Sequence, residues 1–300
     1  MAKNVQGSTI KQSAGSKAFD ILNIIILGVL AIICLYPVWY VVCASFSEPN
    51  LMMQHQGGLI LPAGFSLSSY KAVFENPRIW TGYANTLKIL VISLVCQITM
   101  TSIGAYFFSR KGVLWKKPLM ILITITMFIS GGTIPFYQTI QDFGLQDTHW
   151  GLIIPFMIST YNMIILRTSF ESIPESLCEA ARIDGAGHFK ILFSVILPLS
   201  KAILAVMVMY YGVGTWNGWF WGSTILSDRD MYPLQVVLRE ILISNDTSSM
   251  TAGTAAGDVE AISATIRYAT IMVATIPILC IYPFIQKYFT KGVMVGAVKE

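Results

Sequence analysis

The chain has 300 residues, of which 54% are hydrophobic and only 12% are charged, and its mean hydropathy is +0.63. Soluble domains carry about 25% charged residues, so this composition cannot cover a water-facing surface. It excludes a nucleic-acid-binding domain, a disordered chain and a small disulfide-bonded scaffold, and it predicts an all-α protein embedded in a membrane.

Six stretches are long and apolar enough to cross a bilayer, which requires about 20 apolar residues in a helix. The first, 19–43, is too long for a signal peptide, whose apolar core has about 7–15 residues. We therefore expect a transmembrane domain at 19–286, between tails at 1–18 and 287–300. The other five predicted spans are 84–108, 118–137, 150–166, 202–226 and 267–285.

Lysine and arginine are unevenly distributed between the two sides of these spans. Fourteen lie on the side that holds both termini and five on the other side, with one inside a span. Since cytoplasmic loops are enriched in these residues, we expect an inner-membrane protein with both termini in the cytoplasm. The long segment 167–201 then faces the cytoplasm. Segment 227–266, rich in Ser, Thr and Gly, faces outside as a loop, with a flexible stretch at 247–257.

The segment 167–201 carries signals for two short helices joined by a turn. Ser172, followed three residues later by Glu175 and with a proline between them, fits a capping box at the start of the first helix. Gly185 is expected to end that helix, because glycine adopts the left-handed conformation without penalty. A second helix is predicted over 188–197. The physics alone leaves a solvated loop with helical tendency as the alternative.

The residues of this segment resemble the EAA loop of ABC importer permeases. From Glu179 to Ala202 it reads EAARIDGAGHFKILFSVILPLSKA. The Glu-Ala-Ala triplet, the glycine at 185 and the fuller carbohydrate-permease pattern around it are all matched. The departures are mild: Val195 stands where the family usually has isoleucine, and Lys201-Ala202 stands where many members end in proline.

The resemblance to sugar-importer permeases extends over nearly the whole chain. It includes Ser45-Phe46-Ser47, Asn85-Thr86 and the closing segment 291–297. The stretch SGGTIP at 130–135 is similar to a narrower branch that contains the aldouronate and alginate oligosaccharide importers. The resemblance implies a type I ABC importer permease fold with six transmembrane helices and a cytoplasmic EAA coupling-helix loop.

The family resemblance also implies partners. Two ATP-binding-cassette ATPase subunits would each accept one EAA loop, a second homologous permease would complete the pathway, and a solute-binding protein would dock outside. Because the chain contains no G-x-x-x-x-G-K-[ST] phosphate loop, ATP and Mg²⁺ would be bound by the ATPase subunits, leaving this chain without cofactor or enzymatic activity. The implied coupling residues are Glu179, Ala180, Ala181, Asp184, Gly185 and Ala186.

Polar and aromatic residues of the fourth and fifth predicted spans are candidates for a carbohydrate path. A sugar presents hydroxyl groups at its edges and C–H faces that suit aromatic stacking. Asn162 is favoured because an amide inside a membrane is costly and tends to be functional, whereas tryptophan and tyrosine also mark membrane interfaces. The candidates are Tyr161, Asn162, Tyr210, Tyr211, Trp216 and Asn217.

Other classes of membrane protein fit less well. An ion-coupled secondary transporter acting without an ATPase would need acidic groups inside the spans, yet only Asp20 lies at a span edge. No nucleophile–base pattern indicates an enzyme, and the five cysteines and three histidines lack metal-ligand spacing. The sequence therefore predicts the permease subunit of an ATP-driven carbohydrate importer. Its cargo would be an oligosaccharide, and uronate-containing oligosaccharides fall within this expectation.

Overall fold

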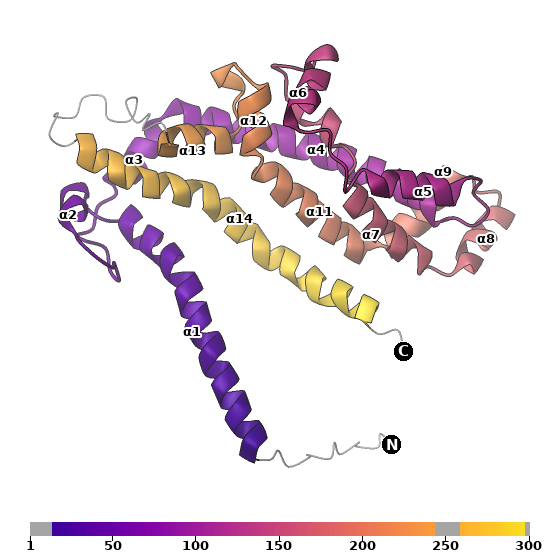
Figure 1. The fold of residues 1–300 in the computed structure, drawn as a ribbon, viewed down its shortest axis with the longest axis horizontal. Coiled ribbons are helices and arrows are strands. Elements are labelled where there is room, and N and C mark those ends of the chain that lie inside the picture. Colours follow the sequence, from indigo (N-terminus) through magenta and orange to yellow (C-terminus); the bar gives the residue numbers. More distant parts are fainter. Residues whose placement is uncertain (1–13, 244–258, 298–300) are drawn as a thin grey trace. The chain divides into compact units, whose positions relative to one another are not determined.

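The computed structural model describes residues 14–243 and 259–297, and every regular element in these ranges is a helix (Figure 1). The structure divides into two units. One contains the chain up to Tyr70 and the first part of α14 (Val259–Ala297), as far as Met272. The other contains the helices from α4 (Pro77–Ser109) to α13 (Leu234–Ile243) and the remainder of α14.

The first unit joins the end of α1 (Ala14–Ser45) to α2 (Pro49–Gln54) and to the start of α3 (Ser68–Glu75). Its small core consists of Cys43, Ala44, Met52 and Leu59, against which Tyr268 of α14 packs. The Ser69 hydroxyl donates to the Thr265 hydroxyl over 2.9 Å. These contacts attach the beginning of α14 to residues that follow α1.

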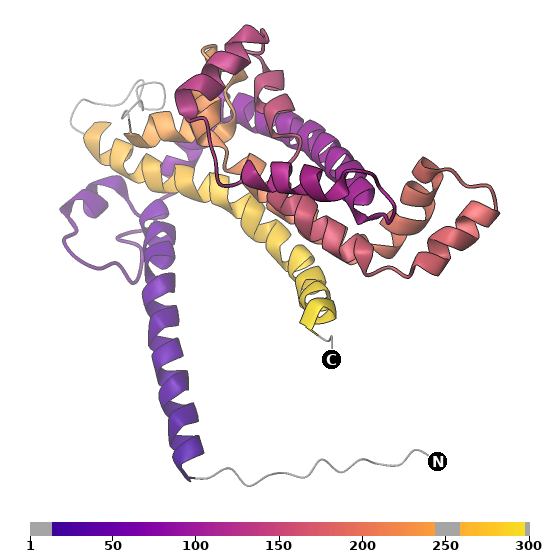
Figure 2. The ribbon, with the colours of Figure 1, turned by 45° about the vertical axis from the view of Figure 1, so that its right-hand side comes forward.

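The second unit is built around α4, which packs along α7 (Thr160–Glu171) and α11 (Lys201–Trp216) (Figures 1 and 2). Helix α4 begins after Asn76, whose side chain accepts the backbone N–H of Arg78, and Pro77 occupies the first helical position, where its missing N–H costs nothing. Buried residues recur every three or four positions along this helix, so that one face is covered. These buried positions include Ile79, Thr86, Ile89, Ser93, Gln97, Thr101 and Ala105.

Three helices are long and apolar enough to cross a membrane, and two further pairs of helices meet the same criterion only when each bent pair is taken as one span. Of the six expected spans, the described residues thus show three clear ones, or five when each bent pair is counted as one span. The three are Gly15–Ser45, Pro77–Ser109 and Ile262–Ile281; the pairs are His149–Phe156 with Thr160–Glu171, bent by 47°, and His188–Leu199 with Lys201–Trp216, bent by 89°.

The prediction of one continuous helix at 118–137 is wrong. The chain instead forms α5 (Lys116–Ile125) and α6 (Thr133–Asp142). Between them Gly132 adopts φ +89°, a conformation that favours glycine. Pro135 lies in the first turn of α6, where an N–H has no helical partner in any case. The apolar stretch is therefore long enough for a span, but its Gly-Gly-Thr-Ile-Pro sequence interrupts the helix.

The predicted spans at 150–166 and 202–226 are also interrupted. The fourth begins with two 3₁₀ turns, η1 (His149–Leu152) and η2 (Ile154–Phe156), before α7. In the fifth, α11 ends at Trp216 and α12 (Trp219–Ile225) follows after a two-residue break. Proline in η2 and glycine at the second break remove helix continuity without lowering the apolar content.

The segment 227–266 is not the plain loop that its polar composition predicts. It contains η4 (Arg229–Met231) and α13, whose buried residues include Leu234, Val237 and Ile241, and α14 begins at Val259 rather than near 267. The stretch 247–257, predicted to be flexible, lies outside the described residues. Helix α14 continues to Ala297, so the predicted C-terminal tail is helical over its described part, and α1 likewise begins within the predicted N-terminal tail.

Candidate functional site

The chain between α7 and α11 forms a helical hairpin, which here denotes residues 175–199. Helix α8 (Glu175–Ile183) is followed by α9 (His188–Ile191), a π-helical turn η3 (Leu192–Ile196) and α10 (Leu197–Leu199). Figure 2 shows α8 and α9 extending past the end of α7. The two predicted helices are present, and the second contains a π turn that the sequence did not indicate.

The turn of the hairpin is organised by Gly185, as predicted. Its φ of +78° lies in the left-handed region. The Ala186 N–H donates to the Ala181 carbonyl and the Gly185 N–H to the Arg182 carbonyl, each over 2.9 Å, which is the bond pattern of a Schellman motif. A side chain at this glycine would strain the turn, so the residue fixes where α8 stops.

The predicted capping box at the start of α8 is wrong. Ser172 terminates α7 instead, and its hydroxyl donates to the Ser169 carbonyl over 2.7 Å. Helix α8 begins at Glu175 after Pro174, with no side-chain cap. Ile173 precedes Pro174, and the residue before a proline is disfavoured in helical conformation, which favours a helix start after the proline.

The EAA residues divide between the two faces of α8. Cys178 is fully buried and Ala181 packs against the core, whereas Glu179 and Ala180 are exposed. Beyond the turn, Ala186 also contacts the core, while Asp184 and Gly185 are exposed. Two large apolar side chains stand out from the same hairpin: Ile183 is 87% and Phe189 is 68% exposed. The hairpin thus presents a carboxylate beside apolar surface.

Arg110, which follows α4, attaches the hairpin to the rest of the unit. Its guanidinium donates to the Cys178 Sγ over 3.1 Å and to the Phe170 carbonyl over 3.4 Å, and it lies 5.0 Å from the centre of the Tyr106 ring. The Tyr106 hydroxyl is 3.2 Å from Nδ1 of His188, in α9. Both helices of the hairpin therefore contact one turn of α4.

A second contact, which is exposed to solvent, also joins the hairpin to the residues that follow α4. The Lys111 ammonium and the Glu175 carboxylate are 2.6 Å apart. Their hydrogen bond and opposite charges raise the pKa of Lys111, and the same hydrogen bond lowers the pKa of Glu175. Solvent and salt screen such a pair, so it orients the start of α8 more than it stabilises the fold.

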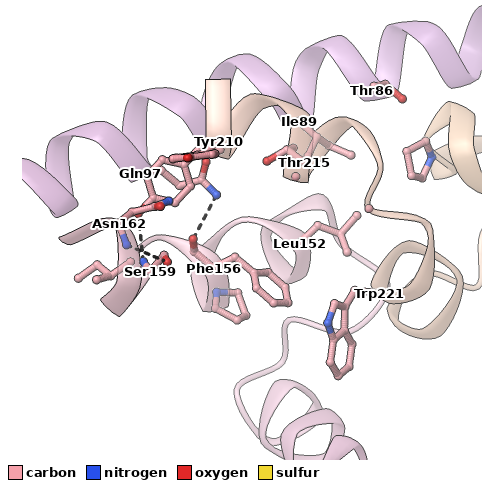
Figure 3. A pocket seen from close by; sticks show the side chains of 16 residues that line it. Thr86, Ile89, Gln97, Leu152, Phe156, Ser159, Asn162, Tyr210, Thr215 and Trp221 are labelled. Carbon is pink, nitrogen blue, oxygen red and sulfur yellow. Dashed lines mark hydrogen bonds between the residues drawn. The ribbon is translucent and has the colours of Figure 1, made fainter. Parts of the chain in front are cut away.

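A cavity of about 350 Å³ lies between α4, α7, α11 and α12 (Figure 3). Its walls carry hydroxyl, amide, aromatic and aliphatic groups, and none of its lining side chains is charged. The polar lining residues are Thr86, Gln97, Ser159, Asn162, Tyr210, Tyr211 and Thr215, and the apolar ones include Ile89, Leu152, Phe156 and Trp221.

Two buried hydrogen-bond groups hold the cavity walls together. The Tyr211 hydroxyl is 2.6 Å from the Thr101 hydroxyl and also accepts the backbone N–H of Ser159 over 3.1 Å. The Gln97 Nε2 donates to the Phe156 carbonyl over 3.1 Å. These bonds connect α4 with α11 and with the turn between η2 and α7, which satisfies polar groups that would otherwise be costly to bury.

The segment that follows α12 is fixed across one end of α4. Asp147 Oδ1 accepts the backbone N–H groups of Ser227 and Asp228, over 2.8 and 3.0 Å, and these bonds lower the pKa of Asp147. The Thr86 hydroxyl, part of the cavity wall, accepts the N–H of Leu234 over 2.8 Å. This part of the predicted loop therefore belongs to the cavity's surroundings.

Three of the six predicted path residues line the cavity together: Asn162, Tyr210 and Tyr211. The other three do not. Tyr161 is 57% exposed, Trp216 is buried with its ring 6.4 Å from that of Tyr83, and Asn217 donates to the Val213 carbonyl of its own helix. Trp216 lies five positions after Tyr211, so it does not share the face of α11 that carries Tyr211.

Sequence reasoning missed several lining residues, and Gln97 is the most informative of them. It lies in the middle of the predicted span 84–108, so the argument that selected Asn162, an amide inside a membrane, applies to it equally. Ser159 and Thr215 carry no such signal, because ordinary turn and helix positions account for them, and Trp221 fits a membrane-interface aromatic residue equally well. Within the described ranges no three His, Cys, Asp or Glu side chains come together as metal ligands.

The described residues thus combine apolar helices of membrane-spanning length, a projecting hairpin and a cavity with no charged lining residue. Residues 12–295 match the family described as "Binding-protein-dependent transport system inner membrane component", and the chain belongs to this family. It is thus a permease subunit of an ABC importer.

Its relatives cover almost the entire chain. Protein LplC of Bacillus subtilis (strain 168) is 34% identical over 97% of this chain and 98% of its own length. The polygalacturonan/rhamnogalacturonan transport system permease protein YtcP of the same organism is 36% identical, over 95% and 99%. A bacterial ABC transporter involved in the import of the acidic polysaccharide alginate contains a similar chain, with 32% identity, a TM-score of 0.84 and coverage of 93% and 99%.

Proposed function

We propose that this chain moves an oligosaccharide from an external solute-binding protein into the cytoplasm by alternating access. The family description supports dependence on a binding protein. The polygalacturonan/rhamnogalacturonan permease and the alginate transporter support carbohydrate as the cargo class. Uronate-containing oligosaccharides fall within that class.

The proposed topology has six membrane crossings with both termini in the cytoplasm. Three long helices and two bent pairs supply five crossings. The sixth is the interrupted stretch of α5 and α6, whose break sits at Gly132. Broken helices are tolerated in a membrane where neighbouring helices satisfy the freed backbone groups. The excess of positive residues on the terminal side supports the orientation.

The observation that carries the coupling role is the geometry of the hairpin. It is anchored through Arg110 and Cys178, and it leaves Glu179 and Ile183 exposed beside one another in the sequence-matched EAA turn. An exposed carboxylate next to apolar surface fits a protein interface with a cation in its groove. We assign this surface to one of two ATPase subunits, which bind ATP and Mg²⁺, while a second homologous permease completes the transporter.

The cavity supplies a place for cargo within this chain. Amide and hydroxyl groups of Asn162, Tyr210 and Thr215 line the same cavity as the aromatic rings of Phe156 and Trp221 (Figure 3). This mixture suits a sugar, whose edges need hydrogen bonds and whose faces are apolar. Closure of the ATPase subunits would move the hairpin and, through α4, the wall of this cavity.

The direct test is purification of the tagged chain from its native membranes in mild detergent, followed by mass spectrometry of the proteins that accompany it. The proposal predicts an ATPase and a second permease of similar length. Recovery of the chain alone, or only as a homo-oligomer, in several detergents would contradict it and would favour an ion-coupled secondary transporter.

A further inference from the structure

A groove of about 500 Å³ runs along α5 and shares no lining residue with the cavity described above. Helix α5 packs on the core of the second unit through Met120 and Ile123, whereas its other sides are open. The groove, here called the α5 groove, is lined by Lys116, Lys117, Ile121, Ile125 and Phe128 and by Arg167 of α7.

The α5 groove is positively charged at one end and apolar along the rest of its length. Lys116 and Lys117 are the first two residues of α5. Apolar residues follow Lys117 at intervals of three or four positions, which places them on the same side of the helix. Ile125 lies about 12 Å beyond Lys117, at about 1.5 Å per residue. Ile121 is 62% and Phe128 is 82% exposed, so this apolar part is open.

The positive charge at the end of the groove is only partly neutralised within the chain. Glu171 Oε1 accepts hydrogen bonds from Lys116 over 3.1 Å and from Arg167 over 2.9 Å, so one carboxylate serves two cations. Lys117 makes no ion pair with any residue that the structure describes. Three cations against one carboxylate leave a local net charge of +2. A partner for this end of the groove must therefore be an anion.

The residues before α5 place its positive end at the surface of the membrane. Leu114 is 82% and Trp115 is 74% exposed, and exposed tryptophan is typical of the membrane–water interface. A soluble anion could pair with the cations but would leave the apolar part of the groove unused. A phospholipid has both a charged headgroup and an apolar chain, and basic pockets between transmembrane helices on the cytoplasmic side bind anionic headgroups.

We propose that the α5 groove binds an anionic phospholipid of the cytoplasmic leaflet. Its phosphate lies against Lys117 and Arg167, and one acyl chain covers Ile121, Ile125 and Phe128. A lipid held in this way joins the start of α5 to the end of α7, directly before the hairpin. The inference rests on the proposed topology, in which α5 is part of a membrane crossing, and it is independent of the cargo and of the ATPase.

The test uses the complete transporter in phosphatidylcholine nanodiscs that contain a small fraction of a photoreactive lipid. The photoreactive lipid is either phosphatidylglycerol or phosphatidylcholine, and both carry the same diazirine-bearing acyl chain. After irradiation, the label on α5 is quantified by mass spectrometry of the peptides. Each basic residue at a membrane surface favours an anionic lipid about fivefold, so phosphatidylglycerol should label α5 at least about tenfold more than phosphatidylcholine does.

Two variants probe the two ends of the groove. Lys117→Gln removes one cation without breaking an ion pair, and the preference for phosphatidylglycerol should fall about fivefold. Lys111→Gln is the matched control, because Lys111 is an exposed cation six positions earlier that does not line the groove, and it should keep the preference. Thr124→Phe fills the groove without a change of charge and should reduce labelling by phosphatidylglycerol; the Thr124 hydroxyl bonds only the Met120 carbonyl of its own helix.

Two results would overturn the lipid site, and they are distinguishable. Equal labelling of α5 by the two lipids in the wild type, or an unchanged preference in Lys117→Gln, rejects the site and leaves the topology and the proposed function intact. Labelling of α5 by neither lipid rejects the site together with the exposure of α5 to the bilayer, as expected if the second permease covers the groove. The comparison of the two lipids needs no variant, so poor folding of a variant cannot obscure it. Oligosaccharide uptake is measured separately, so the proposed function can fail without the lipid site.

Discussion

The hairpin and the cavity lie on the same scaffold but use opposite chemistry. The hairpin makes contacts with the charged side chains of Arg110 and Lys111, in addition to its apolar packing, and it leaves a carboxylate and bulky apolar side chains exposed. The cavity is lined by no charged side chain and is organised by buried hydroxyl and amide groups. Charged groups are used at the exposed hairpin, where a protein partner is expected, and neutral hydrogen bonding is used between the helices around the cavity.

Helix α4 connects these two regions. Tyr106, which contacts the hairpin through His188, lies little more than one turn from Thr101, which bonds Tyr211 beside the cavity. Gln97 is a further turn along. A displacement of the hairpin can therefore reach the cavity wall along a single rigid helix, without passing through a loop. The comparison predicts that hairpin variants abolish transport of all cargoes, whereas cavity variants change the choice among cargoes.

The largest effect is expected for Glu179→Arg. If Glu179 pairs with a cation of the ATPase, reversal of its charge loses that pair and adds a repulsion. Loss of a buried interfacial pair costs about 2–5 kcal/mol, so uptake of every cargo should fall at least about 30-fold while the chain remains inserted. Glu75→Arg, an exposed charge reversal in a surface pair with Lys71, is the control and should transport normally. Normal uptake by Glu179→Arg at normal expression would remove the coupling role.

Gly185→Ala should disturb the hairpin turn. A left-handed conformation costs a non-glycine residue about 1–2 kcal/mol, and φ here is +78°. We expect co-purification of the ATPase to weaken about tenfold. Gly187→Ala is the matched control, because Gly187 has a φ of −72° and nothing within 4 Å of an added Cβ. Equal losses in both variants would show that the turn geometry is not what matters.

Arg110→Met should loosen the hairpin without removing it. Loss of the donors to Cys178 and to the Phe170 carbonyl costs about 1–3 kcal/mol where these groups are buried. The readout is the rate at which a maleimide labels Cys178, which is fully buried, and this rate should rise about tenfold or more. Lys111→Met serves as the control, since its contact is exposed. Unchanged labelling in Arg110→Met would mean that the hairpin is held by apolar packing alone.

The smallest effect on ATPase binding is expected when the ion pair between Lys111 and Glu175 is removed. The pKa of Glu175 is lowered in the folded protein. Its contribution to the stability of the fold is therefore present above the ordinary carboxyl pKa and is lost as the pH falls through the lowered pKa. The pKa of Lys111 is raised in the folded protein. Its contribution to the stability of the fold therefore persists up to the ordinary lysine pKa and disappears as the pH rises through the raised pKa. A double-mutant cycle on ATPase co-purification should therefore give a small coupling at neutral pH that declines at acidic pH and in high salt. A coupling that is insensitive to salt would contradict an exposed ion pair.

The sequence predicts features that depend on local chemistry. The uninterrupted apolar stretches at 19–43 and 84–108 lie inside α1 and α4, and Gly185 ends α8 as its conformational freedom requires. The breaks within 118–137 and 202–226 were missed because counting apolar residues gives no weight to the glycines that interrupt them. Helix α13 was missed because its ten residues, which include Gln235, Arg239 and Glu240, are too few and too polar to be taken as a membrane span and lie between polar stretches.

Only half of the residues predicted to line a carbohydrate path line the cavity, because the sequence shows local chemistry and not tertiary contacts. Asn162 and Tyr211 were found because polar and aromatic groups inside a span are informative by themselves. Which side chains meet is decided by tertiary packing: Gln97 bonds a carbonyl 59 positions away, and Thr101 bonds a tyrosine 110 positions away. No local pattern contains that information. Trp216 and Asn217 lie outside the cavity although their neighbours Thr215 and Gly218 line it.

The central claim is that this chain works as the ATP-driven permease of a binding-protein-dependent importer, with its hairpin as the coupling element. The most direct measurement is oligosaccharide uptake by proteoliposomes that contain the complete purified transporter, with the wild type and Glu179→Arg compared side by side. Uptake by the wild type should require both ATP on the hairpin side and the binding protein on the other side, and Glu179→Arg should abolish it. Uptake that needs only an ion gradient, and that Glu179→Arg leaves unchanged, would contradict the account.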